Sequence, residues 1–117
     1  MTLIHGDKIL DTIKKQLGLP ENYGDFDLQL IIFINTAFLK LADLNVNGTK
    51  PFICNAESLW SDFFKDLDVD DTVKTYIYIN VKLLFDTPSS QITKVLTESM
   101  NECEWRLRLR YDDSDSE

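Results

Sequence analysis

The sequence predicts an all-α fold: a small bundle of four to five helices, with one irregular loop or β-hairpin between the second and third helices. Two observations lead to this prediction. Apolar residues recur at spacings of three and four through most of the chain, and 117 residues suffice for one hydrophobic core but not for two. We therefore expect a single domain over residues 1–111, followed by a disordered acidic tail over residues 112–117.

The first expected helix covers Asp7 to Leu17. Its apolar residues fall on one helical face, Asp7 is a suitable N-terminal cap, and Gly18 with Pro20 is a typical stop. The apolar positions of this face are Ile9, Leu10, Ile13 and Leu17.

The second expected helix runs from Phe26 to Leu44, with Asp25 or Asp27 as its cap. Its main apolar stripe is widened by additional large side chains, so that most of the circumference is apolar, and such a helix is expected at the centre of the fold. The stripe contains Leu30, Ile31, Ile34, Phe38, Leu41 and Ala42, and the widening residues are Leu28, Ile32 and Leu39.

The periodic pattern breaks between Asn45 and Ala56. Asn47-Gly48 is a strong turn dipeptide, and the following Pro-Phe-Ile-Cys segment is short and β-prone, so an extended loop or small hairpin is expected. A short helix from Glu57 to Phe64 then groups Leu59, Trp60, Phe63 and Phe64 on one side, which favours a place in the core.

The stretch from Tyr76 to Pro88 is ambiguous by periodicity. Strict alternation of apolar residues predicts a strand, whereas a helical wheel over Asp71 to Phe85 works equally well and covers more of the apolar residues. Clustered carboxylates at Asp68, Asp70 and Asp71 favour a helix, because the positive end of a helix dipole stabilises them. The helix must end before Pro88.

The last expected helix covers Ser89 to about Arg110, with Thr87 as cap and Pro88 in its first turn. Its stripe, with steps of four, four, three and four, is the cleanest in the chain and consists of Ile92, Leu96, Met100, Cys103 and Leu107. Trp105 and Leu109 lie off this stripe. They indicate either a larger core or a protein–protein contact, since Trp and Arg are enriched at interface hot spots.

Few residues carry recognisable chemistry. The chain has one His and two distant cysteines, Cys54 and Cys103, which do not supply the four ligands at paired spacing that a zinc site needs, and reduced, packed thiols are expected. It lacks phosphate-loop, nucleophile-elbow and zinc-protease motifs, and the acids between Asp66 and Asp71 lack the glycine and distal Glu of a calcium loop. We expect no enzymatic activity, no metal and no cofactor.

The net charge of −8 is unevenly distributed, with six acids and one Lys from Glu57 to Asp71 and four acids after Tyr111. A nucleic-acid-binding protein normally carries a basic face, and this chain shows the reverse. The charge predicts solubility first, and otherwise a surface that repels DNA, mimics it or lines a conduit for it. The longest apolar run, Leu30 to Ile34, is too short for a membrane span, and we expect a protein without a signal peptide that is cytosolic or assembled in the cytosol.

The succession of features resembles the small head–tail connector (head-completion adaptor) proteins of tailed bacteriophages and prophages. The resemblance covers about residues 7–110 and rests on five segments in order: ILDTIKKQLGLPENYGDFD, LIIFINTAFLKLADLNV, SLWSDFF, VKTYIYINVKLLFDTPSS and NECEWRLR. It implies a helical, structural, non-enzymatic protein, and it favours the helical interpretation of Asp71 to Phe85.

The resemblance further implies a ring of copies beneath the portal protein that extends the DNA channel and gives a downstream stopper or tail-completion protein a platform. DNA would pass through without sequence-specific binding, and the location would be the virion's head–tail interface, after assembly in the host cytoplasm. A ring needs two different contact faces on each copy. Our candidate contact residues lie on the last helix and in the loop: Trp105, Arg106, Leu109 and Arg110, with Val46, Pro51, Phe52 and Ile53.

An alternative function from another class is an acidic helical inhibitor or DNA mimic encoded by a mobile element. It requires carboxylates at phosphate-like spacing on one face, whereas the acids here cluster in one segment and the tail. A small regulatory or scaffolding domain is the third possibility.

Overall fold

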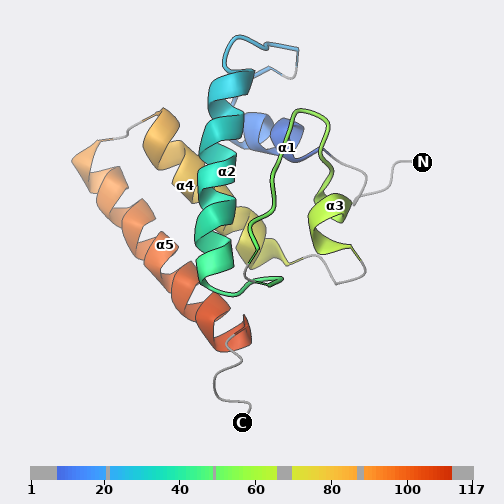
Figure 1. Ribbon diagram of the computed structural model, residues 1–117. Coiled ribbons are helices and arrows are strands. Elements are labelled where there is room, and N and C mark those ends of the chain that lie inside the picture. Colours follow the sequence, from blue (N-terminus) through green and yellow to red (C-terminus); the bar gives the residue numbers. More distant parts are fainter. Residues whose placement is uncertain (1–7, 21, 49, 66–69, 87–88, 112–117) are drawn as a thin grey trace.

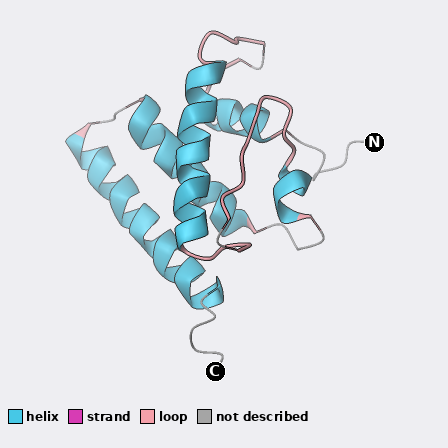
Figure 2. Ribbon diagram, viewed as in Figure 1, coloured by secondary structure: helices cyan, strands magenta, loops and turns pink. Residues whose placement is uncertain are grey.

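The described part of the chain contains five α-helices: α1 (Ile9–Gln16), α2 (Asp27–Asp43), α3 (Trp60–Phe64), α4 (Asp71–Phe85) and α5 (Ser90–Tyr111) (Figures 1 and 2). This computed structural model describes residues 8–20, 22–48, 50–65, 70–86 and 89–111. Several predictions concern residues outside these ranges. They are the caps at Asp7 and Thr87, the acids Asp66 and Asp68, the first-turn residue Pro88 and the disordered tail over residues 112–117. The predicted all-α class is confirmed.

Helix α1 ends at a glycine, as predicted. Gly18 adopts a φ of +81°, and the Leu19 N–H reaches the Lys14 carbonyl oxygen at 2.9 Å, which is the Schellman arrangement. The helix start is tied to a segment much later in the chain: the Ile9 N–H donates to the Ser58 carbonyl at 3.0 Å. Helix α1 is therefore held at both ends by backbone hydrogen bonds.

Helix α2 lies at the centre of the view in Figure 1, with α4 behind it. The prediction that Asp25 or Asp27 caps this helix is wrong: Phe26 is the N-cap residue, and it provides no side-chain capping hydrogen bond. Asp27 instead pairs with the buried Lys14 of α1, with 3.0 Å between Nζ and Oδ1. The carboxylate thus balances a buried cation, and Phe26 packs edge-on against Phe85.

Helix α4 packs between α2 and α5. Its bounds agree with the predicted helix, and Asp70 is its cap, accepting a hydrogen bond from the Thr72 N–H at 3.0 Å. Ile77, Ile79 and Val81 are all buried, although residues two apart point to nearly opposite sides of a helix. Because two neighbouring helices cover α4, its buried arc is wide enough to produce the alternation that resembles a strand.

Polar side chains link the three long helices. The Lys40 ammonium of α2 donates to Asn80 Oδ1 at 2.8 Å, and the Asn80 amide donates to the Tyr76 carbonyl oxygen at 2.8 Å. The Tyr76 hydroxyl donates to Glu104 of α5 at 2.7 Å. Burial, together with the carboxylate, raises the pKa of Tyr76 well above its usual range. The partly hidden polar groups of α4 are therefore paired rather than left unsatisfied.

Residues 44–48 and 50–59 are irregular, and this part of the chain packs beside α2 (Figure 2). The hairpin alternative is not confirmed, because the described residues here contain no strand and one antiparallel bridge joins Lys8 to Leu59. The predicted turn at Asn47-Gly48 is present, with both residues at positive φ. The loop is fixed to α2 by Asn35, whose amide exchanges two hydrogen bonds with the Cys54 backbone, at 3.0 and 2.7 Å.

Helix α3 is shorter than predicted, since it starts at Trp60 rather than Glu57. Asp62 accepts a hydrogen bond from the Leu59 N–H at 2.8 Å, which fixes the first turn. Trp60, Phe63 and Phe64 are buried, which confirms their predicted place in the core. The Trp60 indole N–H is satisfied by the Thr12 hydroxyl of α1 at 2.9 Å.

Candidate functional site

Trp105 and Leu109 lie on the outer face of α5, with exposed fractions of 62% and 65%. Cys103 and Leu107, on the opposite side of the same turns, are buried against the rest of the bundle. The alternative that Trp105 enlarges the core of this chain is therefore wrong. We call Trp105, Arg108 and Leu109 the α5 patch.

All three arginines of the sequence lie between residues 106 and 110, and they have different surroundings. Arg106 pairs with Glu102 one turn earlier on the same helix, at 2.8 Å. Arg110 donates to Asp70 at the start of α4. Among the described residues Arg108 makes no ion pair. No carboxylate within the described ranges therefore neutralises this cation beside the exposed Trp105.

The Arg110 contact belongs to a joint between the start of α4 and the end of α5. Asp70 also accepts from the Tyr111 hydroxyl at 3.0 Å and from the Thr72 N–H. Burial raises the pKa of Asp70, but the hydrogen bonds from Arg110, Thr72 and Tyr111 together outweigh it and hold the pKa below its ordinary value. Arg110 thus stabilises the fold of its own chain.

The four candidate residues in the loop have unequal exposure. Val46 is buried, because it follows Asn45 at the end of α2 in a Schellman arrangement that points a hydrophobic residue back onto the helix. Phe52 packs against Phe38, and the ring centroids are 5.0 Å apart. Pro51 is partly buried and Ile53 is exposed. That these residues contact another subunit stays a prediction.

A second exposed apolar row lies on α2 and consists of Leu28, Ile32 and Leu39, with exposed fractions of 79%, 62% and 53%. Sequence reasoning assigned these residues to a widened core stripe. Their spacing of four and seven residues places them on one side of the helix, away from Ile34, Leu41 and the other buried positions. We call these three residues the α2 row. Their position outside the main apolar stripe was the sequence signal that could have indicated this exposure.

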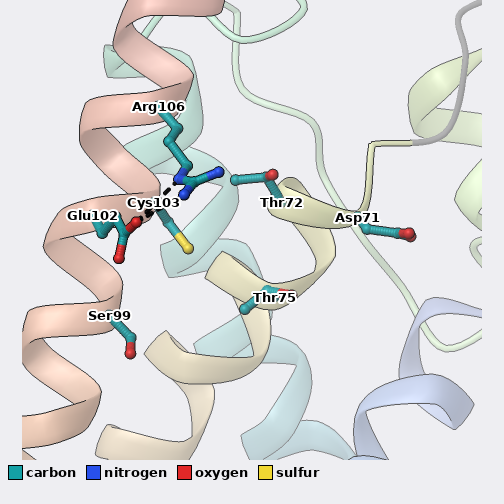
Figure 3. A pocket seen from close by; sticks show the side chains of 7 residues that line it. All are labelled: Asp71, Thr72, Thr75, Ser99, Glu102, Cys103 and Arg106. Carbon is teal, nitrogen blue, oxygen red and sulfur yellow. Dashed lines mark hydrogen bonds and ion pairs between the residues drawn. The ribbon is translucent and has the colours of Figure 1, made fainter.

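A shallow hollow of about 340 Å³ lies between the first turns of α4 and the middle of α5 (Figure 3). Its lining includes Cys103, Arg106 and Glu102, and the last two are already paired with each other. Burial raises the pKa of the Cys103 thiol, which keeps it protonated at neutral pH. The hollow therefore offers hydrogen-bonding groups and no activated nucleophile.

The remaining predicted chemistry concerns the cysteines and metal ligands. Cys54 and Cys103 are free and buried, which confirms the prediction of packed thiols. Over the described ranges, no group of three or more His, Cys, Asp or Glu side chains is placed to hold a metal ion. None of the helices in these ranges combines the length and apolar character that a membrane span requires.

Comparison with known proteins places the chain in a family. No curated protein and no solved structure matches it. The family model described as phage connector protein matches residues 9–114, which include all five helices given above. This match agrees with the resemblance to head–tail connectors found in the sequence. The chain belongs to the phage connector protein family.

Proposed function

We propose that the chain is a structural subunit of a phage head–tail connector. Copies form a ring under the portal protein, extend the channel through which DNA passes and give a stopper or tail-completion protein its platform. The subunit works by binding other proteins and has no enzymatic activity. It assembles in the bacterial host cytoplasm and remains at the head–tail interface of the virion.

The observation that carries this proposal is the family match over residues 9–114, and the exposed surface supports it. A ring subunit needs two different contact faces. The α2 row and the α5 patch are two exposed apolar surfaces on different helices. A monomer gains nothing from placing a Trp and several large aliphatic side chains in water, whereas an assembly buries them.

The charge of the chain also supports a channel role. Tight, nonspecific DNA binding depends on Lys and Arg that neutralise phosphates. The net charge here is −8, and two of the three arginines, Arg106 and Arg110, are already paired with carboxylates. DNA therefore passes such a subunit without being retained.

The DNA-mimic alternative is less well supported by the arrangement of the carboxylates. Asp27 pairs with Lys14, Asp70 with Arg110 and Asp86 with Lys82. These acids are bound to the chain's own cations at separate places in the fold. A mimic requires free carboxylates in register on one face, and these pairings favour the connector instead.

The proposal is tested by mixing the purified chain with the portal protein encoded in the same phage or prophage and imaging the product by electron cryomicroscopy. The expected result is added ring density under the portal, absent from portal alone. Failure to bind the portal, together with a strictly monomeric state at high concentration, would overturn the proposal. A gel-shift assay with double-stranded DNA at physiological salt is expected to show no retention, and tight binding there would contradict the channel role.

A further inference from the structure

We propose that neighbouring copies meet through the α2 row of one and the α5 patch of the next, with Trp105 and Leu109 packed on Ile32 and Leu39 and Arg108 facing Asp43. This assignment rests on the proposed ring. It names the surfaces that the ring uses and makes the contact heterologous, so that each copy contributes both halves to different neighbours.

The α2 row can be dehydrated at little cost, because the polar residues between its members are satisfied within their own chain. The Thr36 hydroxyl donates to the Ile32 carbonyl oxygen at 3.0 Å. The Asn35 side chain faces the loop, where its amide N–H donates to the Cys54 carbonyl oxygen and its amide oxygen accepts from the Cys54 N–H. A buried polar group without a partner costs free energy, and here neither side chain would lose one.

The spacing of the two surfaces suits a helix-on-helix contact. Ile32 and Leu39 are seven residues apart, about 10.5 Å along the axis, which leaves room over Thr36 for a large side chain. Trp105 and Leu109 are one turn apart on α5, and both project outward. The Trp105 indole fills the space between Ile32 and Leu39 as a ridge entering a groove. A large aromatic side chain in a central pocket is the usual energetic centre of an interface.

Charge selects this pairing over the symmetric ones. Among the described residues, neither Arg108 beside Trp105 nor Asp43 beside Leu39 forms an ion pair. Contact of α5 with α5 would bring two arginine-rich helix ends together. Contact of α2 with α2 would not bring Arg108 opposite Asp43. Like charges placed opposite each other are unfavourable, whereas Arg108 against Asp43 is complementary.

Charge reversal at these two positions tests the proposal. Wild type, Asp43→Arg, Arg108→Asp and the double variant are each added to portal rings, and lateral assembly is measured by cryomicroscopy and sedimentation. Each single variant is expected to weaken lateral assembly tenfold or more, because like charges then face each other. In the double variant the charges are again opposite, and assembly is expected to recover to within about threefold. Lys94→Asp, an equal charge change at an exposed position on α5, is the matched control and should assemble as wild type does.

The outcomes separate this assignment from the proposed function. If wild type forms portal-bound rings and both single variants do so equally well, the assignment is wrong and the ring stands. If the double variant fails to recover, Arg108 and Asp43 do not face each other, and the assignment is again overturned. If wild type neither binds the portal nor self-associates, the proposed function itself fails.

Cross-linking tests the direction of the contact without relying on charge. Leu39→Cys and Leu109→Cys, which the proposed register places beside each other, are made singly and together, and assembled samples are oxidised and separated on a non-reducing gel. The double variant is expected to give a ladder of multimers, and each single variant only monomer. Wild type, whose own Cys54 and Cys103 are buried, reports the background. A cross-linked dimer from either single variant would indicate a symmetric contact and contradict the proposal.

Discussion

Helices α4 and α5 pack against each other and use their apolar residues in different ways. Six of the fifteen residues of α4 are buried, whereas only two of the twenty-two residues of α5 are buried. Helix α4 lies between two neighbours, and α5 is covered on one side (Figure 1). The difference indicates that α4 holds the subunit together, while the outer face of α5 remains available to other proteins.

Within α4 and α5, the largest expected effect follows from shortening a central side chain of α4. Ile77 has no exposed surface, so Ile77→Ala leaves a cavity and is expected to lower the free energy of unfolding by about 3 kcal/mol. Urea denaturation followed by circular dichroism measures this value. Val95→Ala on the exposed face of α5 is the control, with an expected change below about 0.5 kcal/mol. Equal losses in the two variants would remove the distinction between the helices.

Asp70→Ala breaks the joint between the two helices and is expected to cost about 1–2 kcal/mol, because it removes an N-cap and the acceptor of Arg110 and Tyr111. Because the pKa of Asp70 is lowered by folding, its contribution is present above the unfolded pKa and is lost as the pH falls through the folded one. Asp70→Asn keeps a good cap, and its stability should fall less steeply below about pH 4 than that of wild type. If the stabilities of wild type and Asp70→Asn fall equally steeply below about pH 4, this role of Asp70 is contradicted.

Tyr76→Phe removes the hydrogen bond from α4 to Glu104 of α5 while keeping the ring in the core. The expected loss is about 1 kcal/mol at neutral pH. Because folding raises the pKa of Tyr76, wild-type stability is full below about pH 10 and falls above it. The Tyr76→Phe variant lacks this titration, so the two stabilities should converge in alkaline solution. A constant difference between about pH 8 and pH 11 would show that Tyr76 does not titrate as described.

Trp105→Ala is expected to have the smallest effect on the isolated subunit, below about 0.5 kcal/mol, because the side chain is already 62% exposed. Thermal unfolding of the monomer measures it. Trp60→Ala is the matched comparison and should cost about 3–5 kcal/mol, since that indole is fully buried and hydrogen-bonded to Thr12. A large loss from Trp105→Ala would place that residue in the fold rather than at an interface.

The sequence was sufficient to predict the helices whose ends carry local signals. The bounds of α4 follow from the Asp70 cap and the approaching Pro88, and the end of α1 follows from Gly18. It was not sufficient for the exposure of Leu28, Ile32 and Leu39. Periodicity defines which residues share a face, but how far neighbouring elements extend around a helix depends on tertiary packing.

The interface candidates show the same limit. Trp105 was identified because it lies off the buried stripe, which is a local property of α5. The inward position of Val46 depends on the chain reversal after α2, and that of Phe52 depends on Phe38 and Phe63, which are distant in sequence. A short apolar loop has no period from which its buried side can be inferred.

The attachment of α1 has a consequence for the order of folding. Besides α2, its partners come from residues around the start of α3, and the Thr12–Trp60 hydrogen bond joins residues 48 positions apart. Helices α4 and α5 are consecutive in the chain, so their contact closes a much shorter loop. We expect amides of α4 to gain protection in pulsed hydrogen exchange before those of α1, because contacts between distant residues form later. The contacts that join the N-terminal helix to the start of α3 are thus expected to form after the contact between α4 and α5.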